Sequence, residues 1–165
     1  MVKVDIIDKI SIPEGVEVSI DSNQINVKGP KGELSRGIFT PGIKIEVKEN
    51  EVIFSIKKAA KKEKMGLKTT EAHLKNMING VNEEYVYKLK ICSGHFPMTV
   101  SLENQEVIVK NFLGESVPRK KKMQTGAEIE IKGNDITVTS IDIEKAGQVA
   151  ASIEALTRIT NKDRR

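Results

Sequence analysis

Two short stretches of the chain have side chains whose types and spacing permit chemistry. Cys92-Ser93-Gly94-His95 places a thiol three residues before an imidazole, and Arg119-Lys120-Lys121-Lys122 places four cations in succession. A thiol and an imidazole are half of a metal site, or a nucleophile with its base. Four adjacent cations have the charge to bind several phosphates. The chain therefore offers one candidate for catalysis or metal binding and one for anion binding.

The thiol–imidazole pair has a simpler structural explanation. The chain contains one Cys and two His, so no second pair completes four zinc ligands. The short motifs of serine hydrolases, zinc proteases, P-loop proteins and dinucleotide-binding proteins are absent from the sequence. We interpret Cys92 as a structural thiol on a strand and His95 as a turn residue, with catalysis or metal binding kept as the alternative. The prediction is no enzymatic activity, no metal, no cofactor and no small-molecule substrate.

The four consecutive cations are better evidence for a binding partner. They follow Pro118, which predicts that they project from a stiffened loop whose path is set by Gly114 and Pro118. Like charges packed together repel, so a folded protein gains little from them without an anionic partner. The C-terminal end adds four more cations, close to a single acid: Arg158, Lys162, Arg164 and Arg165.

A third group of cations runs beside the apolar stripe of a predicted helix. It comprises Lys57, Lys61, Lys64, Lys68 and Lys75. Lysines along one side of an amphipathic helix are most simply its solvated face, so we give this group no binding role.

Composition limits the class of protein further. The chain has 165 residues, 18.3 kDa and a net charge of +4, and residues 83–165 hold 13 basic and 12 acidic side chains. Any positive surface must therefore be local. No apolar run approaches the roughly 20 residues of a membrane-spanning helix, and residues 1–10 do not resemble a secretory signal. A single Cys excludes an internal disulfide. We expect a cytoplasmic protein with no membrane association.

An internal repeat organises the chain. VSIDSNQINVKGPKGE from Val18 aligns without a gap on VSLENQEVIVKNFLGE from Val100, and IEVKENEVIFS from Ile45 resembles IEIKGNDITVT from Ile129. A helix-like segment follows in each half. Three similar blocks in the same order predict two copies of one small domain. We expect domains at residues 1–82 and 83–165, with the second, which holds both basic segments, as the main anion-binding half.

Periodicity gives each copy the same elements. Alternating apolar residues predict hairpins around residues 16–27, and at residues 44–48 with 51–56, and Lys132-Gly133-Asn134-Asp135 makes the corresponding turn in the second half. Long Gly/Pro-containing loops begin at Gly29 and Asn111. Apolar stripes predict two helices: Ala60, Leu67, Leu74, Ile78 and Val81, with Gly80 as a stop; and Ala146, Val149, Ile153 and Leu156, with Asp142 as N-cap. The prediction is an α+β fold in which one helix covers an antiparallel sheet in each domain.

The aromatic residues indicate which kind of nucleic acid could be the anionic partner. No strand shows the aromatic pattern of common single-strand RNA readers, and only Phe96 and Phe112 lie near the basic segments. Either ring could stack on a base, although core packing is the simpler role. Structured RNA, held through its backbone and shape, suits these residues better than sequence reading.

At this point the sequence resembles a known family. NFLGESVPRK, residues 111–120, resembles the NFLGE-x-x-PRK signature of the archaeal and eukaryotic branch of large-subunit ribosomal protein six. IPEGVEVSID from Ile12, VKGPKGELSR from Val27, NMINGV from Asn76, YKLKICSGHFP from Tyr87 and GQVAASIEALTRI from Gly147 agree in the same order. The resemblance covers almost the whole chain.

The resemblance implies a structural ribosomal protein, located in the cytoplasm on the ribosome. It implies binding to large-subunit ribosomal RNA near the sarcin–ricin loop and the translation-factor site, mainly through the second domain, residues 83–165, which is thus the main RNA-binding half. Neighbouring ribosomal proteins are implied as further partners. The implied RNA-facing residues are Lys110, Asn111, Gly114, Arg119, Lys120, Lys121, Arg158, Lys162, Arg164 and Arg165, to which the cation cluster adds Lys122. A free RNA-binding regulator and a protein-interaction module remain the alternatives.

Overall fold

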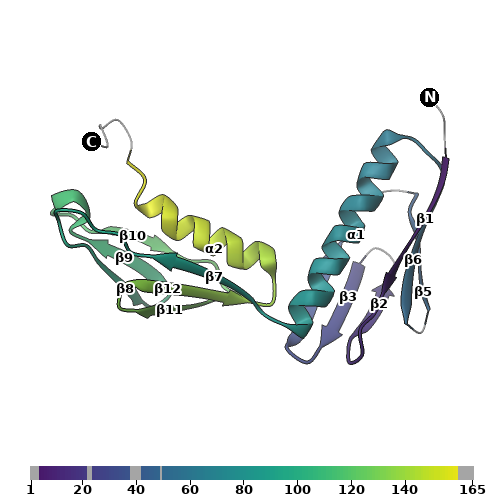
Figure 1. Ribbon diagram of the computed structural model, residues 1–165, viewed down its shortest axis with the longest axis horizontal. Helices are drawn as coiled ribbons and strands as arrows, with labels where there is room; N and C mark the ends of the chain where they lie inside the picture. The colour runs from purple at the N-terminus through teal and green to yellow at the C-terminus, as the bar shows by residue number, and fades with distance from the viewer. Residues whose placement is uncertain (1–3, 22–23, 38–41, 49, 160–165) are drawn as a thin grey trace. The chain divides into compact units, whose positions relative to one another are not determined.

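The computed structural model describes residues 4–21, 24–37, 42–48 and 50–159, and Figure 1 traces it from the N-terminus to the C-terminus. Backbone contacts divide the chain into two compact units, Met1–Glu84 and Tyr85–Arg165. This division falls two residues after the domain boundary expected from the sequence. That the second unit is the main RNA-binding half stays a prediction.

Unit 1 is built from two three-stranded antiparallel sheets and one helix. Its elements are β1 (Val4–Ser11), β2 (Glu17–Asp21), β3 (Gln24–Gly29), β4 (Gly32–Gly37), β5 (Lys44–Lys48), β6 (Glu51–Ala59) and α1 (Lys61–Asn82). One sheet has the order β1-β6-β5 and the other β2-β3-β4. Figure 1 shows α1 lying across the strands of this unit.

Unit 2 repeats this plan element by element. It contains β7 (Tyr85–Lys90), β8 (Thr99–Glu103), β9 (Glu106–Lys110), the short 3₁₀ turn η1 (Phe112–Gly114), β10 (Arg119–Lys122), β11 (Glu128–Lys132), β12 (Asp135–Ser140) and α2 (Ile143–Leu156). Its sheets are β11-β12-β7 and β10-β9-β8. The matching order of strands confirms the duplicated α+β fold.

The predicted hairpins are confirmed, whereas the long loops are wrong in part. β2 pairs with β3, β5 with β6, and β11 with β12, all antiparallel. Each expected loop, however, contains an additional strand, β4 in unit 1 and β10 in unit 2. Both are edge strands whose partners were already recognised as strands. Their own residues alternate weakly, so only the pairing with β3 and β9 makes them strands.

Each helix closes a separate hydrophobic core. Leu67, Leu74 and Val81 of α1 are fully buried against residues such as Val27 and Phe54 of the sheets. In unit 2 the buried stripe of α2 is Ala146, Val149, Ala150 and Ile153, packed against Val107, Val109, Ile136 and Val138. The predicted apolar stripes are therefore the core faces of both helices, except that Ala60 is the N-cap residue before α1 and is only partly buried.

The start of α2 agrees with the sequence prediction, whereas the end of α1 does not. The Asp142 carboxylate accepts a hydrogen bond from the backbone N–H of Glu144 at 2.9 Å, so Asp142 is the N-cap of α2 as expected. Gly80 is not a stop, because α1 continues to Asn82 and buries Gly80. Neither helix, in the part of the chain that the structure describes, is long and apolar enough to cross a membrane.

Candidate nucleic-acid interface

The four consecutive cations lie on a strand and not on a loop. Arg119–Lys122 form β10, the edge strand beside β9, with Lys120 opposite Ile108 and Lys121 opposite Val107. Residues 107–109 of β9 are buried and need a hydrogen-bonded strand on each side. Backbone pairing to this buried strand therefore overrides the poor strand propensity of four successive cations.

The pleat of the sheet sorts these cations onto two faces. Successive side chains of a strand point to opposite faces, so Lys120 and Lys122 share one face and Arg119 and Lys121 the other. Because Lys120 pairs with Ile108, Lys110 lies on the same face as Lys120 and Lys122. All three of these lysines are exposed. The structure thus brings together cations that are ten residues apart in sequence.

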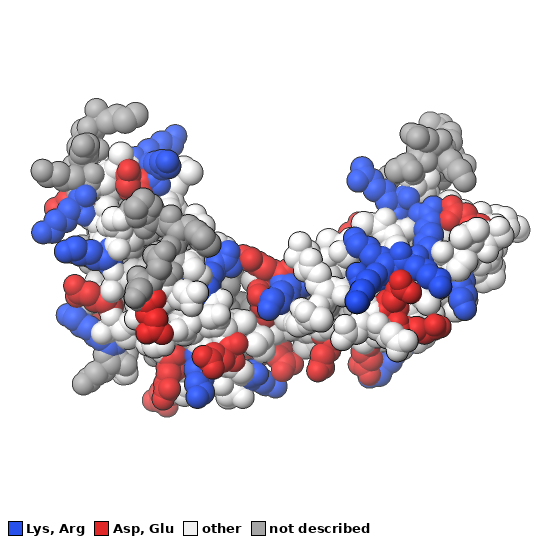
Figure 2. All heavy atoms as spheres, turned by 180° about the vertical axis from the view of Figure 1, so that it is seen from behind, with Lys and Arg blue, Asp and Glu red and all other residues white. Residues whose placement is uncertain are grey.

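Lys110 and the three lysines of β10 lack ion-pair partners among the described residues. No Asp or Glu oxygen in the described ranges lies within salt-bridge distance of Lys110, Lys120, Lys121 or Lys122. Figure 2 shows Lys and Arg side chains gathered on the second unit, with acidic side chains beside them. Glu106 lies on the same face, opposite Lys122, but it does not form an ion pair with these lysines, and the three lysines of that face outnumber it. Neighbouring cations on one sheet repel one another, and an anionic partner relieves that repulsion.

Arg119 differs from the lysines because its guanidinium is held within the protein. Its Nε and Nη2 donate to the two carboxylate oxygens of Glu115, both at 2.7 Å. Its Nη1 donates to the backbone carbonyls of Leu156 at 2.8 Å and Arg158 at 3.1 Å. The guanidinium carbon also lies 4.4 Å from the centre of the Phe112 ring. The bonded Glu115 carboxylate raises the pKa of Arg119 above its ordinary value.

These contacts make Arg119 a positioning residue. Four of the five guanidinium N–H groups have protein acceptors, which leaves one for an external phosphate. The two carbonyls belong to the C-terminal end of α2, whose last turn has no basic residue of its own. Arg119 supplies a cation there and ties β10 to the segment that carries Arg158. A direct contact between Arg119 and RNA stays a prediction.

The turn before β10 is built from residues with left-handed backbone. Asn111, Leu113 and Gly114 have φ angles of +58°, +49° and +78°. The amide nitrogen of Asn111 donates to the carbonyl of Pro97 at 2.9 Å, which joins this turn to the loop before β8. Gly114 adopts its conformation without strain, whereas Leu113 does not. The expected influence of Gly114 on the path of the chain agrees with this geometry.

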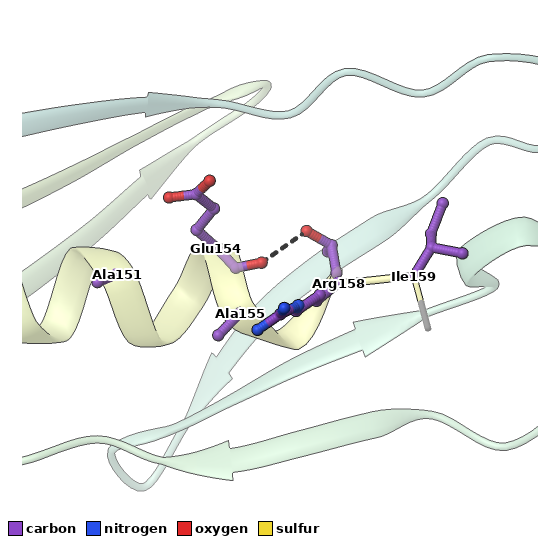
Figure 3. A pocket seen from close by; sticks show the side chains of 6 residues that line it. Ala151, Glu154, Ala155, Arg158 and Ile159 are labelled. Atoms are coloured by element: carbon purple, nitrogen blue, oxygen red, sulfur yellow. Dashed lines mark hydrogen bonds between the residues drawn. The ribbon is translucent and has the colours of Figure 1, made fainter. Parts of the chain in front are cut away.

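The C-terminal cations are only partly within the described residues. Arg158 is exposed and lines a hollow of about 500 Å³ with Ala151, Glu154, Ala155, Thr157 and Ile159. In Figure 3 the Arg158 side chain lies beside Ala155, and the Glu154 side chain points away from it. Lys162, Arg164 and Arg165 lie outside the described residues, so their roles stay predictions.

The helix lysines of unit 1 are partly neutralised. Nζ of Lys68 lies 2.8 Å from Glu71 and 3.2 Å from Asp8, and Nζ of Lys75 lies 2.8 Å from Glu71. The hydrogen bonds from Lys68 and then Lys75 lower the pKa of Glu71, which is 8% exposed. The same bond to Glu71, followed by that to Asp8, raises the pKa of Lys68. These contacts agree with a solvated helix face and not with a phosphate site.

Cys92 lies in the loop after β7 and not on a strand as expected. Both Cys92 and His95 are exposed, and the His95 ring lies edge-to-face against Phe96, with ring centres 5.1 Å apart. No group of three or more His, Cys, Asp or Glu side chains within the described ranges is arranged to hold a metal ion.

Sequence reasoning missed Glu115 and the structural role of Arg119. The sequence did contain a signal for this contact, because Glu115 lies four residues before Arg119. In the structure the two side chains form a bidentate pair. The two carbonyls of the α2 end were not predictable in this way, because they lie 37 and 39 residues from Arg119.

Comparison with known proteins finds similarity along almost the whole chain. A family model described as "Ribosomal protein L6" matches residues 12–84 and 96–165, one segment in each unit. The chain is 43% identical to "Large ribosomal subunit protein uL6" of Methanobrevibacter smithii, over 96% of this chain and 89% of that protein. It is 43% identical to the protein of the same name from Methanosarcina mazei, over 100% and 93%. The corresponding protein of Aeropyrum pernix is 39% identical, over 98% and 90%.

Proposed function

This chain belongs to the ribosomal protein L6 family, and from that premise we propose that it binds large-subunit ribosomal RNA through the cations of unit 2. As a member of this family it is a structural component of the large ribosomal subunit, located in the cytoplasm on the ribosome, and not an enzyme. The proposed site lies near the sarcin–ricin loop and the translation-factor site, and the proposed role is to support subunit assembly and translation. Neighbouring ribosomal proteins are further proposed partners.

One observation carries the RNA-binding proposal. Lys110, Lys120 and Lys122 are exposed on one face of a sheet, and no carboxylate among the described residues lies within ion-pair distance of them, although Glu106 is opposite Lys122 on that face. Each lysine that contacts a phosphate releases condensed counterions, which makes the binding free energy favourable and dependent on salt. The relatives carry the name of a large-subunit protein, and large-subunit RNA is the polyanion that such a protein meets.

The mechanism requires no chemical step. The sheet β10-β9-β8 holds the lysines at the spacing of the strands, and Arg119 ties this sheet to the α2 end where Arg158 lies. The RNA backbone then meets several cations whose backbone positions are already determined. Since little backbone ordering accompanies binding, more of the electrostatic free energy appears as affinity.

A salt titration tests the proposal. The RNA is a transcript of the large-subunit region containing the sarcin–ricin loop, from Methanosarcina mazei. Replacing Lys110, Lys120 and Lys122 by Ala is expected to weaken binding by roughly tenfold or more, and to reduce the slope of log affinity against log salt by about 2 to 3.

The matched control removes the same charge from unit 1. Lys61, Lys62 and Lys64 are exposed residues of α1, and their replacement by Ala also lowers the net charge by three. This control is expected to leave affinity and slope close to wild type. Equal losses in both variants would show that net charge, and not this group of three lysines, governs binding. An unchanged slope in the Lys110/Lys120/Lys122 variant would show that these lysines do not contact RNA phosphates. A transcript lacking the sarcin–ricin loop tests the proposed location.

A further inference from the structure

One exposed aromatic ring stands beside the basic face and has no role in the account above. Of the two rings near the basic segments, Phe112 packs against the unit 2 core and lies under the Arg119 guanidinium. Phe96 is 46% exposed. The structure thus separates two residues that are equivalent in the sequence: Phe112 has a packing role and Phe96 presents its ring to solvent.

Phe96 is braced although it is exposed. Three of its ring carbons lie 3.5 to 3.8 Å from the position that a Cβ on Gly114 would occupy, so the ring rests against the η1 turn. On another side the His95 ring meets it edge-to-face, with an interplanar angle of 82°. The next residue, Pro97, is held through its carbonyl by the Asn111 amide at 2.9 Å. A ring restrained in this way loses little freedom when it binds a ligand.

The surroundings of Phe96 combine apolar surface with unpaired positive charge. Leu113, next to the Gly114 against which the ring rests, is 53% exposed. Lys110 precedes Asn111 and is exposed, and it pairs with Thr99, two residues after Pro97. A ligand matching both features has a flat apolar part and a negatively charged part. A nucleotide has both, whereas an apolar peptide segment leaves the cation unmatched.

We propose that Phe96, supported by His95, is a stacking platform for one unpaired nucleobase of the bound RNA, while Lys110 contacts the adjoining phosphate. The proposal rests on the RNA-binding function proposed above and adds a base contact to the phosphate contacts of β10. Every nucleobase has a π-face, so such a platform binds any splayed base, without reading its identity.

A tryptophan reporter tests the stacking directly, because the chain contains no Trp. The full-length Phe96→Trp variant is titrated with the transcript containing the sarcin–ricin loop, and its emission is followed. A base stacked on the indole is expected to quench the emission strongly at saturation. The control is Leu102→Trp on β8, at a residue that is 39% exposed, and its emission is expected to change little.

Affinity provides the second measurement. Phe96→Leu keeps an apolar side chain but removes the π-face, and it is expected to weaken binding about 5- to 150-fold, nearer the lower figure. Phe96→Tyr keeps the ring and is expected to bind like wild type. Thermal unfolding of each variant shows whether the fold is retained, and the emission of Phe96→Trp keeps the proposal testable if Phe96→Leu is unstable.

The outcomes separate this inference from the proposed function. Failure of the wild-type protein to bind the transcript with salt-dependent affinity would remove the proposed function and the stacking platform together. Binding by Phe96→Trp without quenching, together with wild-type affinity of Phe96→Leu, would overturn the stacking platform alone. Unchanged RNA affinity of Phe96→Leu with reduced retention on large subunits would also overturn it, and would assign the ring to a protein contact.

Discussion

At the scale of single residues, Arg119 shows why a cation in a basic cluster need not face the polyanion. Its guanidinium makes a bidentate pair with Glu115 and donates to the carbonyls of Leu156 and Arg158. Lysine keeps the charge but lacks the planar fork, so Arg119→Lys is expected to lower the free energy of unfolding by about 2 kcal/mol. Urea unfolding followed by circular dichroism measures this change.

The comparison variant is Glu115→Gln, which removes the charge of the other partner. The double variant is expected to be less destabilised than the sum of the two single variants, because both remove the same contact. RNA affinity distinguishes the two roles of the arginine. A direct phosphate contact is largely kept by Arg119→Lys, whereas a positioning role predicts weaker binding that tracks the loss of stability. Full stability in Arg119→Lys would contradict the positioning role.

At the scale of secondary structure elements, the end of β3 shows how closely a strand and a helix approach in unit 1. A Cβ on Gly29 would lie 2.8 Å from Cγ2 of Val81 and 3.0 Å from the Val81 carbonyl oxygen, near the end of α1. The same carbonyl accepts a hydrogen bond from the N–H of Lys31 at 3.0 Å, so the backbone cannot easily move away. Gly29→Ala is expected to destabilise the protein by about 1 to 3 kcal/mol.

Thermal unfolding provides the measurement for this substitution. The control is Gly94→Ala, since a Cβ at Gly94 would meet no atom within 4 Å. A midpoint for Gly29→Ala equal to that of Gly94→Ala would show that α1 and β3 separate without cost. The difference between the two midpoints measures how closely α1 is held to β3 in unit 1.

At the scale of the whole molecule, the lysines of α1 that contact Glu71 and the lysines of β10 differ in their ion pairing. Unit 1 pairs Lys68 and Lys75 with the largely buried Glu71, while unit 2 leaves the lysines of β10 without partners among the described residues. The lysine contacts hold the pKa of Glu71 below its ordinary value of 4.5. A carboxylate with a depressed folded-state pKa contributes stability above its unfolded-state pKa, and this contribution is lost as the pH falls through the folded value.

Acid titration of stability tests this difference. The free energy of unfolding of the wild-type chain is expected to exceed that of Glu71→Gln near neutral pH, and the gap is expected to narrow as the pH falls below about 4.5. Urea unfolding at a series of pH values, followed by far-ultraviolet circular dichroism, measures the gap. A gap that is constant from pH 7 to 3 would contradict the ion-pair account of Glu71.

The amino-acid sequence alone determined the duplicated plan of this protein. Local patterns were sufficient for the hairpins, for the apolar stripes of both helices and for the Asp142 cap, because each depends on residues close together in the chain. The cluster at residues 119–122 was visible for the same reason. The likeness of the two halves added the α+β duplication and the family.

Only the tertiary structure decided which way the functional side chains face. β10 is a strand because buried β9 pairs with it, and this pairing places Lys120 and Lys122 beside Lys110 while it turns Arg119 toward the end of α2. Phe96 and Phe112 look alike in sequence, but the contacts of the η1 turn expose one and bury most of the other. These outcomes depend on contacts between residues distant in the chain, which local patterns do not contain.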